Sequence, residues 1–223
     1  MWRREGKIKM YQTILFDLDG TITDPGLGIT NSVMYALDKF GIKVEERTSL
    51  YKFIGPPLQE SFAKYYHFSE EDVSRAVSYY REYYSDRGIY ENVLYDGITE
   101  LFDQIKSSGR RIILATSKPE GFTDVILKHF KISHYFDFVA GATMDGSRNS
   151  KADIIAYAIK AGQITDLKSA VMVGDREYDI IGARAAGLDS IGVLYGYGSR
   201  EELLSAGATY IAERVEDIPK NID

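Results

Sequence analysis

Two aspartates separated by one residue, Asp17 and Asp19, follow the apolar run Ile14-Leu15-Phe16. An apolar run of this length is typical of a buried strand in a parallel sheet. Open α/β sheets bind ligands beyond the carboxyl ends of their strands, where these two carboxylates fall. At about 4 Å and an effective dielectric constant near 20 their repulsion costs about 4 kcal/mol, which a divalent cation or a shared proton relieves. The pattern, completed by Gly20 and Thr21, therefore indicates a hard-metal site with one carboxylate free to react.

Two other interpretations explain less of this stretch. In an EF-hand calcium loop the glycine stands sixth, a glutamate stands twelfth and a helix precedes the loop. Here Gly20 stands fourth counting from Asp17, and a strand precedes it. An ordinary polar turn, in which Asp and Gly are common, remains the alternative to a metal site.

Hydroxyl groups follow the second expected strand, Arg111–Ala115. Thr116 and Ser117 stand at its carboxyl end, directly before Lys118. A hydroxyl together with backbone N–H groups at such a place can hold an oxyanion. Because Ser and Thr are also common in loops, this interpretation depends on what else shares the same edge of the sheet.

A lysine opens the helix expected over Lys151–Ala161. Ser150 and Asp153 have the spacing of a capping box, which places the helix start at Lys151. A cation at a helix N-terminus opposes the helix dipole unless an anion binds there, in which case both attract the anion. Lys151 is therefore either an anion ligand or a solvated surface lysine, and Lys118 competes with it for the first role.

Another pair of acids ends the strand expected over Ala170–Val173. Asp175 stands at the strand end, and Asp179 lies four residues later, one turn along the same side of a following helix. An amphipathic helix start has the same pattern, so this pair is ambiguous when taken alone.

The order of elements predicts a parallel sheet that brings these strand ends together. From Asp96 onward strands alternate with helices of about ten residues, which is typical of right-handed βαβ units with helices on both faces. The expected elements are the helix Ile98–Ser107, strand Arg111–Ala115, helix Gly121–Phe130, strand Phe136–Ala140, helix Lys151–Ala161, strand Ala170–Val173, helix Tyr178–Ala186, strand Ser190–Leu194, helix Glu201–Ser205 and strand Thr209–Ala212. We therefore predict an α/β fold with a doubly wound, Rossmann-like parallel sheet.

A helical insert separates the first strand from the others. Apolar residues at helical spacing predict helices at Ile29–Phe40, Leu58–Tyr66 and Glu70–Asp86, and no segment between Gly28 and Tyr90 is a clear strand. We predict a core domain made of residues 1–25 and 90–223, and a helical cap domain made of residues 26–89.

The composition excludes several classes of protein. The 223 residues carry a formal net charge of −6, which argues against a nucleic-acid polymer or an anionic membrane as partner. No apolar run approaches the length of a transmembrane helix, and the basic first ten residues lack the apolar centre of a secretory signal. The absence of cysteine excludes thiol catalysis and is compatible with the cytoplasm. The three histidines are scattered, which disfavours a zinc site.

Taken together, the motifs resemble those of the haloacid dehalogenase superfamily of aspartate-nucleophile phosphatases. The stretch FDLDGT at residues 16–21 is similar to motif I, Thr116 to motif II, Lys151 to motif III, and the Gly174-Asp-x-x-x-Asp179 segment to motif IV. The four motifs stand in the right order, three of them directly at expected strand ends. The resemblance covers nearly the whole chain, including a C1-type helical cap after motif I, and is to the branch of phosphoglycolate phosphatases and 5′-nucleotidases.

This resemblance implies a division of labour among the motif residues. Asp17 attacks phosphorus and forms an aspartyl-phosphate, while Asp19 acts first as general acid and then as general base. Thr116 and Lys151 hold the phosphoryl oxygens. Mg²⁺ is the implied cofactor, with ligands from Asp17, the backbone carbonyl of Asp19, Asp175, and Asp179 directly or through water.

The resemblance also implies where the substrate binds. Gly20, Thr21 and Ser117 are the substrate-binding candidates in the core, and Gly55 and Pro56 are those in the cap loop at residues 53–58. The cap is crowded with tyrosines, which either stack on a nucleobase or pack the cap helices. Two basic cap residues, each either a ligand for a substrate anion or ordinary surface charge, are Arg47 and Lys52.

We therefore expect a Mg²⁺-dependent phosphatase of small phosphorylated metabolites, of the phosphoglycolate or nucleoside monophosphate type. It would act as a monomer or homodimer in the cytoplasm. A phosphomutase of the β-phosphoglucomutase type shares all four motifs and is the alternative. A receiver-like regulator also uses a phosphorylated aspartate with Thr and Lys, but it needs only about half this length and no cap.

Overall fold

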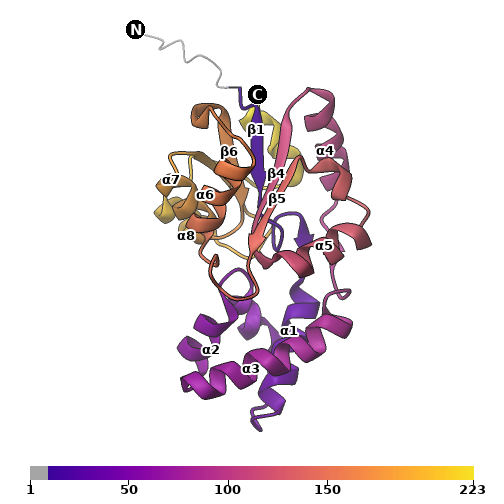
Figure 1. Ribbon diagram of the computed structural model, residues 1–223, viewed down its shortest axis with the longest axis vertical. Helices are drawn as coiled ribbons and strands as arrows, with labels where there is room; N and C mark the ends of the chain where they lie inside the picture. The colour runs from indigo at the N-terminus through magenta and orange to yellow at the C-terminus, as the bar shows by residue number, and fades with distance from the viewer. Residues whose placement is uncertain (1–9) are drawn as a thin grey trace.

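Six strands form one parallel sheet in the computed structural model, which describes residues 10–223 (Figure 1). The expectation about a secretory signal lies largely outside these residues. The strands are β1 (Thr13–Phe16), β4 (Arg111–Pro119), β5 (Phe138–Ala142), β6 (Ala170–Gly174), β7 (Asp189–Val193) and β8 (Tyr210–Ala212). Their order is β5-β4-β1-β6-β7-β8, so β1 pairs with β4 on one side and with β6 on the other. The carboxyl ends of β1, β4 and β6 therefore meet at one edge.

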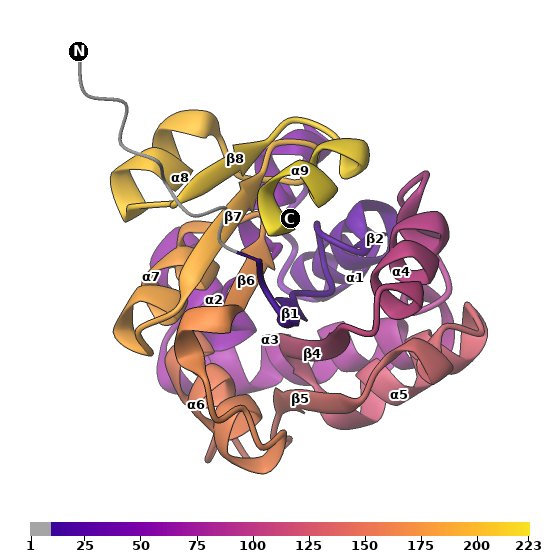
Figure 2. The same ribbon diagram turned by 90° about the horizontal axis from the view of Figure 1, so that it is seen from above.

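Helices cover both faces of this sheet (Figure 2). One face carries α4 (Ile98–Ser107) and α5 (Glu120–His129), with the short α9 (Pro219–Ile222). The other face carries α6 (Lys151–Ala161), α7 (Glu177–Ala185) and α8 (Arg200–Ala206). The predicted doubly wound α/β fold is confirmed.

The central strand shows why this arrangement follows from the sequence. Ile14 and Phe16 point into the core beneath α4, whereas Leu15 points into the core beneath α6. Side chains alternate across a strand, so a strand buried on both faces needs an unbroken apolar run. The run ends where the sheet ends, and Asp17 is the first residue beyond it.

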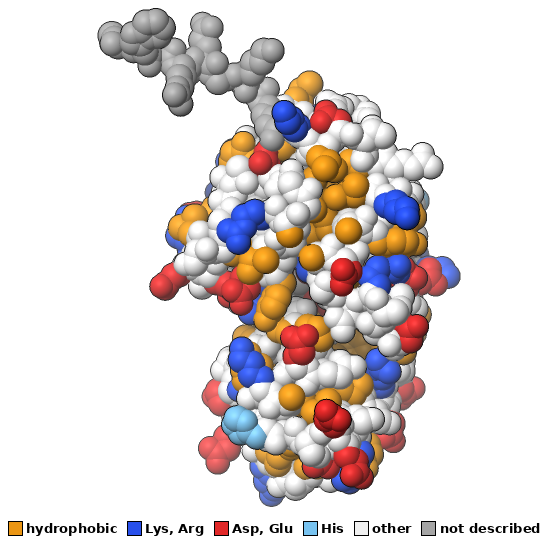
Figure 3. Space-filling model, turned by 60° about the vertical axis from the view of Figure 1, so that its left-hand side comes forward, with side chains coloured by type: hydrophobic (Ala, Val, Ile, Leu, Met, Phe, Trp, Pro, Cys, Tyr) orange, Lys and Arg blue, Asp and Glu red, His pale blue; other side chains and the backbone are white. Residues whose placement is uncertain are grey.

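The helices of residues 26–89, which we call the cap, form a second lobe (Figures 1 and 3). They are α1 (Gly26–Asp38), the 3₁₀ helix η1 (Arg47–Phe53), α2 (Leu58–Tyr66), α3 (Glu70–Tyr83) and the π-helical turn η2 (Tyr84–Gly88). The chain leaves and re-enters the core through β2 (Thr23–Asp24) and β3 (Val93–Leu94), which pair antiparallel. No helix among residues 10–223 has the length and apolar character needed to cross a membrane.

Several elements differ from the sequence-based expectation. β4 continues past Ala115 to Pro119 with a register shift, and β5 begins two residues later than expected. The helix expected over Glu70–Asp86 changes to π-helical geometry at Tyr84. The strands β2 and β3 and the helices η1 and α9 were not predicted, because such short elements leave no hydrophobic period to detect.

We expect Phe102→Ala to destabilise the fold strongly. The Phe102 side chain is fully buried on α4, with ring centroids 5.3 Å from Phe16 and 5.5 Å from Phe136. Its removal would leave a cavity and lower the free energy of unfolding by about 3–5 kcal/mol, measured by urea denaturation. Leu204→Ala, at a side chain 53% exposed, is the control and should change stability by less than about 0.5 kcal/mol. Equal losses would contradict this account of the core.

Candidate active site

Three buried carboxylates and one ammonium meet at the carboxyl edge of the sheet. Asp17 comes from the end of β1, Asp175 from the end of β6, and Asp179 from the first turn of α7. One oxygen from each lies within 4.8 Å of the others, so the three could share a metal ion. Lys151 Nζ lies 2.7 Å from Asp17 Oδ1 and 2.8 Å from Asp179 Oδ1.

The helix α6 delivers Lys151 to this cluster. The Ser150 hydroxyl accepts a hydrogen bond from the Asp153 N–H, which is the N-cap expected from the sequence. Lys151 Nζ also donates to the Ala115 carbonyl at 3.1 Å, so the lysine bridges β1, β4 and α7. Lys151 is therefore not a solvated surface lysine.

Burial and mutual repulsion dominate the electrostatics of the cluster. Burial raises the pKa of the Asp175 carboxyl well above its usual range, and Asp179 and Asp17 add to this effect. Burial also raises the pKa of Asp179, against the opposing charge of Lys151. For Lys151, burial acts to lower the pKa, but the adjacent carboxylates outweigh burial and raise it. Three carboxyl groups thus face one ammonium group, and a divalent cation would favour the ionised form of the carboxyl groups.

Gly20 and Thr21 contact Asp175 and do not line the cavity described below. Thr21 Oγ1 donates to Asp175 Oδ1 at 3.4 Å, and the Tyr197 N–H donates to Asp175 Oδ2 at 2.8 Å. Gly20 has a φ of 83°, and a β-carbon there would stand 2.2 Å from Asp175 Oδ2. Their predicted role in binding substrate stays a prediction, whereas their contact with Asp175 is direct.

Asp19 is not one of the three clustered carboxylates and pairs with the second candidate lysine. Lys118 Nζ is 2.9 Å from Asp19 Oδ2, and both side chains are largely buried. Burial raises the pKa of the Asp19 carboxyl, against the opposing charge of Lys118. The two candidate anion-binding lysines thus pair with different aspartates: Lys118 pairs with Asp19, and Lys151 pairs with Asp17 and Asp179.

A cavity of about 210 Å³ lies between the core and the cap; Figure 3 shows the surface hollowed where the two lobes meet. Asp17, Asp19, Thr116 and Ser117 line it from the core. The predicted cap loop also faces this cavity, with Gly55 and Pro56 among the lining residues. The other cap residues that line it are Ile29, Phe53, Pro57, Leu58, Gln59, Tyr80, Arg81 and Tyr84.

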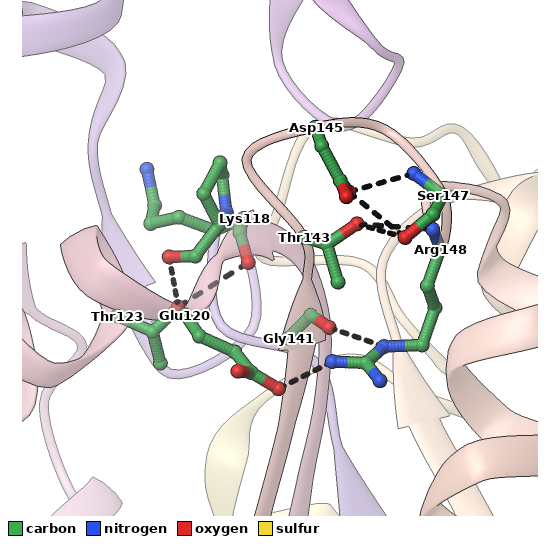
Figure 4. Close-up of polar contacts among 9 residues, drawn as sticks. Lys118, Glu120, Thr123, Gly141, Thr143, Asp145, Ser147 and Arg148 are labelled. Atoms are coloured by element: carbon green, nitrogen blue, oxygen red, sulfur yellow. Dashed lines mark hydrogen bonds and ion pairs between the residues drawn. The ribbon is translucent and has the colours of Figure 1, made fainter.

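The loop between β5 and α6 forms another wall of the cavity and is braced from behind (Figure 4). Arg148 Nε donates to the Gly141 carbonyl at 2.9 Å, and its guanidinium pairs with Glu120. The Asp145 carboxylate accepts from the Ser147 N–H at 3.0 Å, which closes the loop tip. These contacts were not predicted, since they join residues that form no motif.

Arg176 fastens the cap loop to the core. Its Nη1 donates to the Ile54 carbonyl at 2.6 Å, and its Nε pairs with Glu202 at 2.8 Å. The sequence offers no signal for this role, because the Asp-x-x-x-Asp pattern does not specify a residue type at position 176.

The remaining cap candidates divide into packing and cavity residues. Tyr79 packs on Phe40 inside the cap, whereas Tyr80 and Tyr84 face the cavity. Arg47 donates to the Thr30 hydroxyl and the Asn31 side chain, which makes it part of the cap scaffold. The Lys52 ammonium lies over the Tyr65 ring, 4.3 Å from its centroid. Neither Arg47 nor Lys52 is among the residues that line the cavity.

Comparison with known proteins gives consistent matches over nearly the whole chain. The family model described as haloacid dehalogenase-like hydrolase matches residues 14–193. A crystal structure of a predicted phosphatase from Clostridium acetobutylicum is 50% identical, covers 96% of this chain and 98% of its own, and superposes with a TM-score of 0.92. A 5′-nucleotidase of Pseudomonas aeruginosa is 40% identical over 90% of each chain. The tyrosine-protein kinase PtkA of Mycobacterium tuberculosis is 39% identical over 90% of this chain and 68% of its own.

We expect Gly20→Ala to destabilise the protein more than Gly109→Ala. Both glycines have positive φ angles, 83° and 76°, at which a β-carbon costs about 1–2 kcal/mol. A β-carbon at Gly109 meets nothing within 4 Å, whereas one at Gly20 overlaps the Asp175 carboxylate. Urea denaturation of the two variants measures the difference, and equal losses in the free energy of unfolding would refute the close approach of Gly20 to Asp175.

Proposed function

Because the chain belongs to the haloacid dehalogenase-like hydrolase family, we propose that it is a Mg²⁺-dependent phosphatase that hydrolyses small phosphomonoesters through an aspartyl-phosphate on Asp17. The membership itself confirms the resemblance predicted from the four motifs, and with it the predicted enzyme class, a hydrolase of the phosphatase branch. The substrate, the metal and the roles of individual residues are our proposal.

One observation carries the proposal: Asp17 stands where the cavity meets the charged cluster. Asp17 lines the cavity, its carboxylate pairs with Lys151 at 2.7 Å, and it shares a possible metal site with Asp175 and Asp179. A nucleophile for phosphorus needs this combination, since it must reach the substrate while nearby positive charge offsets the phosphoryl charge.

The residues present fit a hard divalent cation. Asp17, Asp175 and Asp179 offer carboxylate oxygens, the ligand type that Mg²⁺ prefers, and all three are buried close together. Mg²⁺ bound there would supply positive charge against the phosphoryl oxygens. Asp19 would contribute its backbone carbonyl, since its carboxylate is engaged by Lys118.

The protein residues then divide the two half-reactions. In the first, an Asp17 oxygen forms a bond to phosphorus while the bond to the ester oxygen breaks, and Asp19 gives that oxygen its proton. In the second, Asp19 takes a proton from the water that attacks phosphorus, which frees phosphate and regenerates Asp17. Lys151 and the Thr116 hydroxyl would hold the phosphoryl oxygens during both steps. The cap would exclude bulk water and contact the leaving group.

Of the two expected substrate types, we propose nucleoside monophosphates. The cavity next to Asp17 is lined by the aromatic side chains of Phe53, Tyr80, Tyr84 and Phe122, which suit a flat base. A relative 40% identical to this chain carries the name 5′-nucleotidase. We further propose that the enzyme acts in the cytoplasm as a monomer or homodimer.

The phosphomutase alternative uses the same residues but returns the phosphoryl group to a sugar phosphate. It differs in the fate of the intermediate, because a mutase must lose its aspartyl-phosphate to water slowly. Release of inorganic phosphate at the rate of ester consumption would support the phosphatase, and slow release with transfer to a sugar phosphate would support the mutase.

We expect Asp17→Asn to abolish phosphate release with Mg²⁺ from a panel of esters. The panel holds p-nitrophenyl phosphate, phosphoglycolate, nucleoside monophosphates, hexose phosphates and pyrophosphate. The amide cannot form the aspartyl-phosphate, whereas Asp38→Asn, at an exposed cap position, should retain full activity. Chelation of divalent ions should stop the wild type. No release by folded wild-type protein with Mg²⁺ would refute the proposal.

A further inference from the structure

We propose that Lys118 and the cap residue Tyr84 together position Asp19, so that proton transfer at the core depends on a hydroxyl group supplied by the cap. This inference rests on the proposed function. It assigns no direct chemistry to either residue, since both act through Asp19.

The contacts form a continuous chain from the cap to the catalytic aspartate. Lys118 Nζ lies 2.9 Å from Asp19 Oδ2 and donates to the Tyr84 hydroxyl oxygen at 2.6 Å. The Lys118 and Asp19 side chains are only 5% and 13% exposed. The other Asp19 oxygen, Oδ1, is buried and accepts no hydrogen bond from any residue in the range 10–223. One oxygen of Asp19 is thus anchored, and the other stays available for the proton that moves.

Lys118 is itself held rigidly. Its N–H donates to the Thr116 hydroxyl at 3.2 Å, and the Thr123 hydroxyl donates to its carbonyl at 3.4 Å, a contact drawn in Figure 4. The extension of β4 beyond Ala115 carries Lys118 to the cavity wall. A side chain fixed at its base and paired at its tip loses few conformations when it holds Asp19.

Tyr84 is held by aromatic packing on both sides of the boundary between the cap and the core. It begins the π-helical turn η2, its ring stacks on Tyr80 at 5.3 Å, and the edge of Phe122 in the core packs against it at 5.3 Å. Its ring also lies 4.7 Å from the Lys118 ammonium. The Tyr84 side chain thus reaches from the cap to the core.

The two lysines at this edge therefore have separate tasks. Lys151 offsets the charge of Asp17 and Asp179, whereas Lys118 contacts Asp19 and the cap. The competing possibility is that Lys118 binds the phosphoryl group directly. The two possibilities predict different kinetics. If Lys118 positions Asp19, its loss slows the ester whose leaving group needs a proton more than the ester whose leaving group needs none. If Lys118 binds the phosphoryl group, its loss slows both esters equally.

The test uses Lys118→Met and Tyr84→Phe with two esters. Nucleoside monophosphate has an alkoxide leaving group that needs a proton from Asp19, whereas p-nitrophenolate leaves without one. We expect Lys118→Met to lower kcat for the nucleotide by about 10–100-fold, a part of the full effect of general acid–base catalysis, and Tyr84→Phe to lower it several-fold. Both variants should keep the wild-type rate of p-nitrophenolate release in a single turnover, measured with enzyme in excess over ester, and inhibition by inorganic phosphate should be unchanged.

The double variant and two controls complete the test. Since Tyr84 acts through Lys118, the double variant should lose no more kcat than Lys118→Met alone. Tyr79→Phe, on the same cap helix but packed inside the cap, and Lys128→Met, paired with Asp124 on the surface, should match the wild type. If Lys118→Met fails to fold, Tyr84→Phe carries the test, because it removes a single hydroxyl group.

Several outcomes would overturn the inference. Equal losses on the nucleotide and in the single-turnover release of p-nitrophenolate, or weaker inhibition by phosphate, would place Lys118 in direct contact with the phosphoryl group. Additive losses in the double variant would make Tyr84 independent of Lys118. If the wild type is active, either of these results refutes this inference alone. If the wild type is inactive, the proposed function and this inference are refuted together.

Discussion

The repulsion among buried carboxylates at one edge of the sheet is the constraint on which the rest of the structure depends. One carboxylate oxygen each of Asp17, Asp175 and Asp179 lies within 4.8 Å of the others, and burial raises the pKa of Asp175 and Asp179. A folded chain can hold them together only by bringing positive charge and hydrogen-bond donors to the same place. Lys151 from α6 and the N–H group of Tyr197 meet that need from two different segments. The electrostatic repulsion is thus a consequence of placing reactive carboxylates where water is excluded.

The parallel sheet makes this concentration of charge possible. β1 lies between β4 and β6, so three strands deliver an aspartate, a threonine and a second aspartate to one edge. The cores under α4 and under α6 bury the strands on both faces, which leaves the strand ends little freedom to separate. Gly20 permits a turn so tight that the backbone touches the Asp175 carboxylate, and no other residue type fits that space.

The cap completes the site through a small number of contacts across the cavity. Arg176 holds the carbonyl of Ile54, and Tyr84 reaches Lys118, so loop and helix are each fastened to the core by a charged side chain. Aromatic packing inside the cap, such as that of Phe53 on Phe62, fixes the positions from which these groups reach out. Lys118 and Tyr84 both line the cavity, so their contact forms part of its wall.

The sequence by itself determined the sheet, the helical insert and the identity of the motif residues, because these depend on local hydrophobic periods and on spacing along the chain. It predicted that Asp17, Thr116, Lys151 and Asp175 would share one edge, and they do. Only the tertiary structure decided which lysine pairs with which aspartate, that Gly20 and Thr21 contact Asp175, and that Tyr84 among many cap tyrosines reaches the core. Lys118 and Tyr84 are 34 residues apart and lie in different lobes. Their contact depends on how the cap packs against the core, which leaves no periodic signal in the sequence.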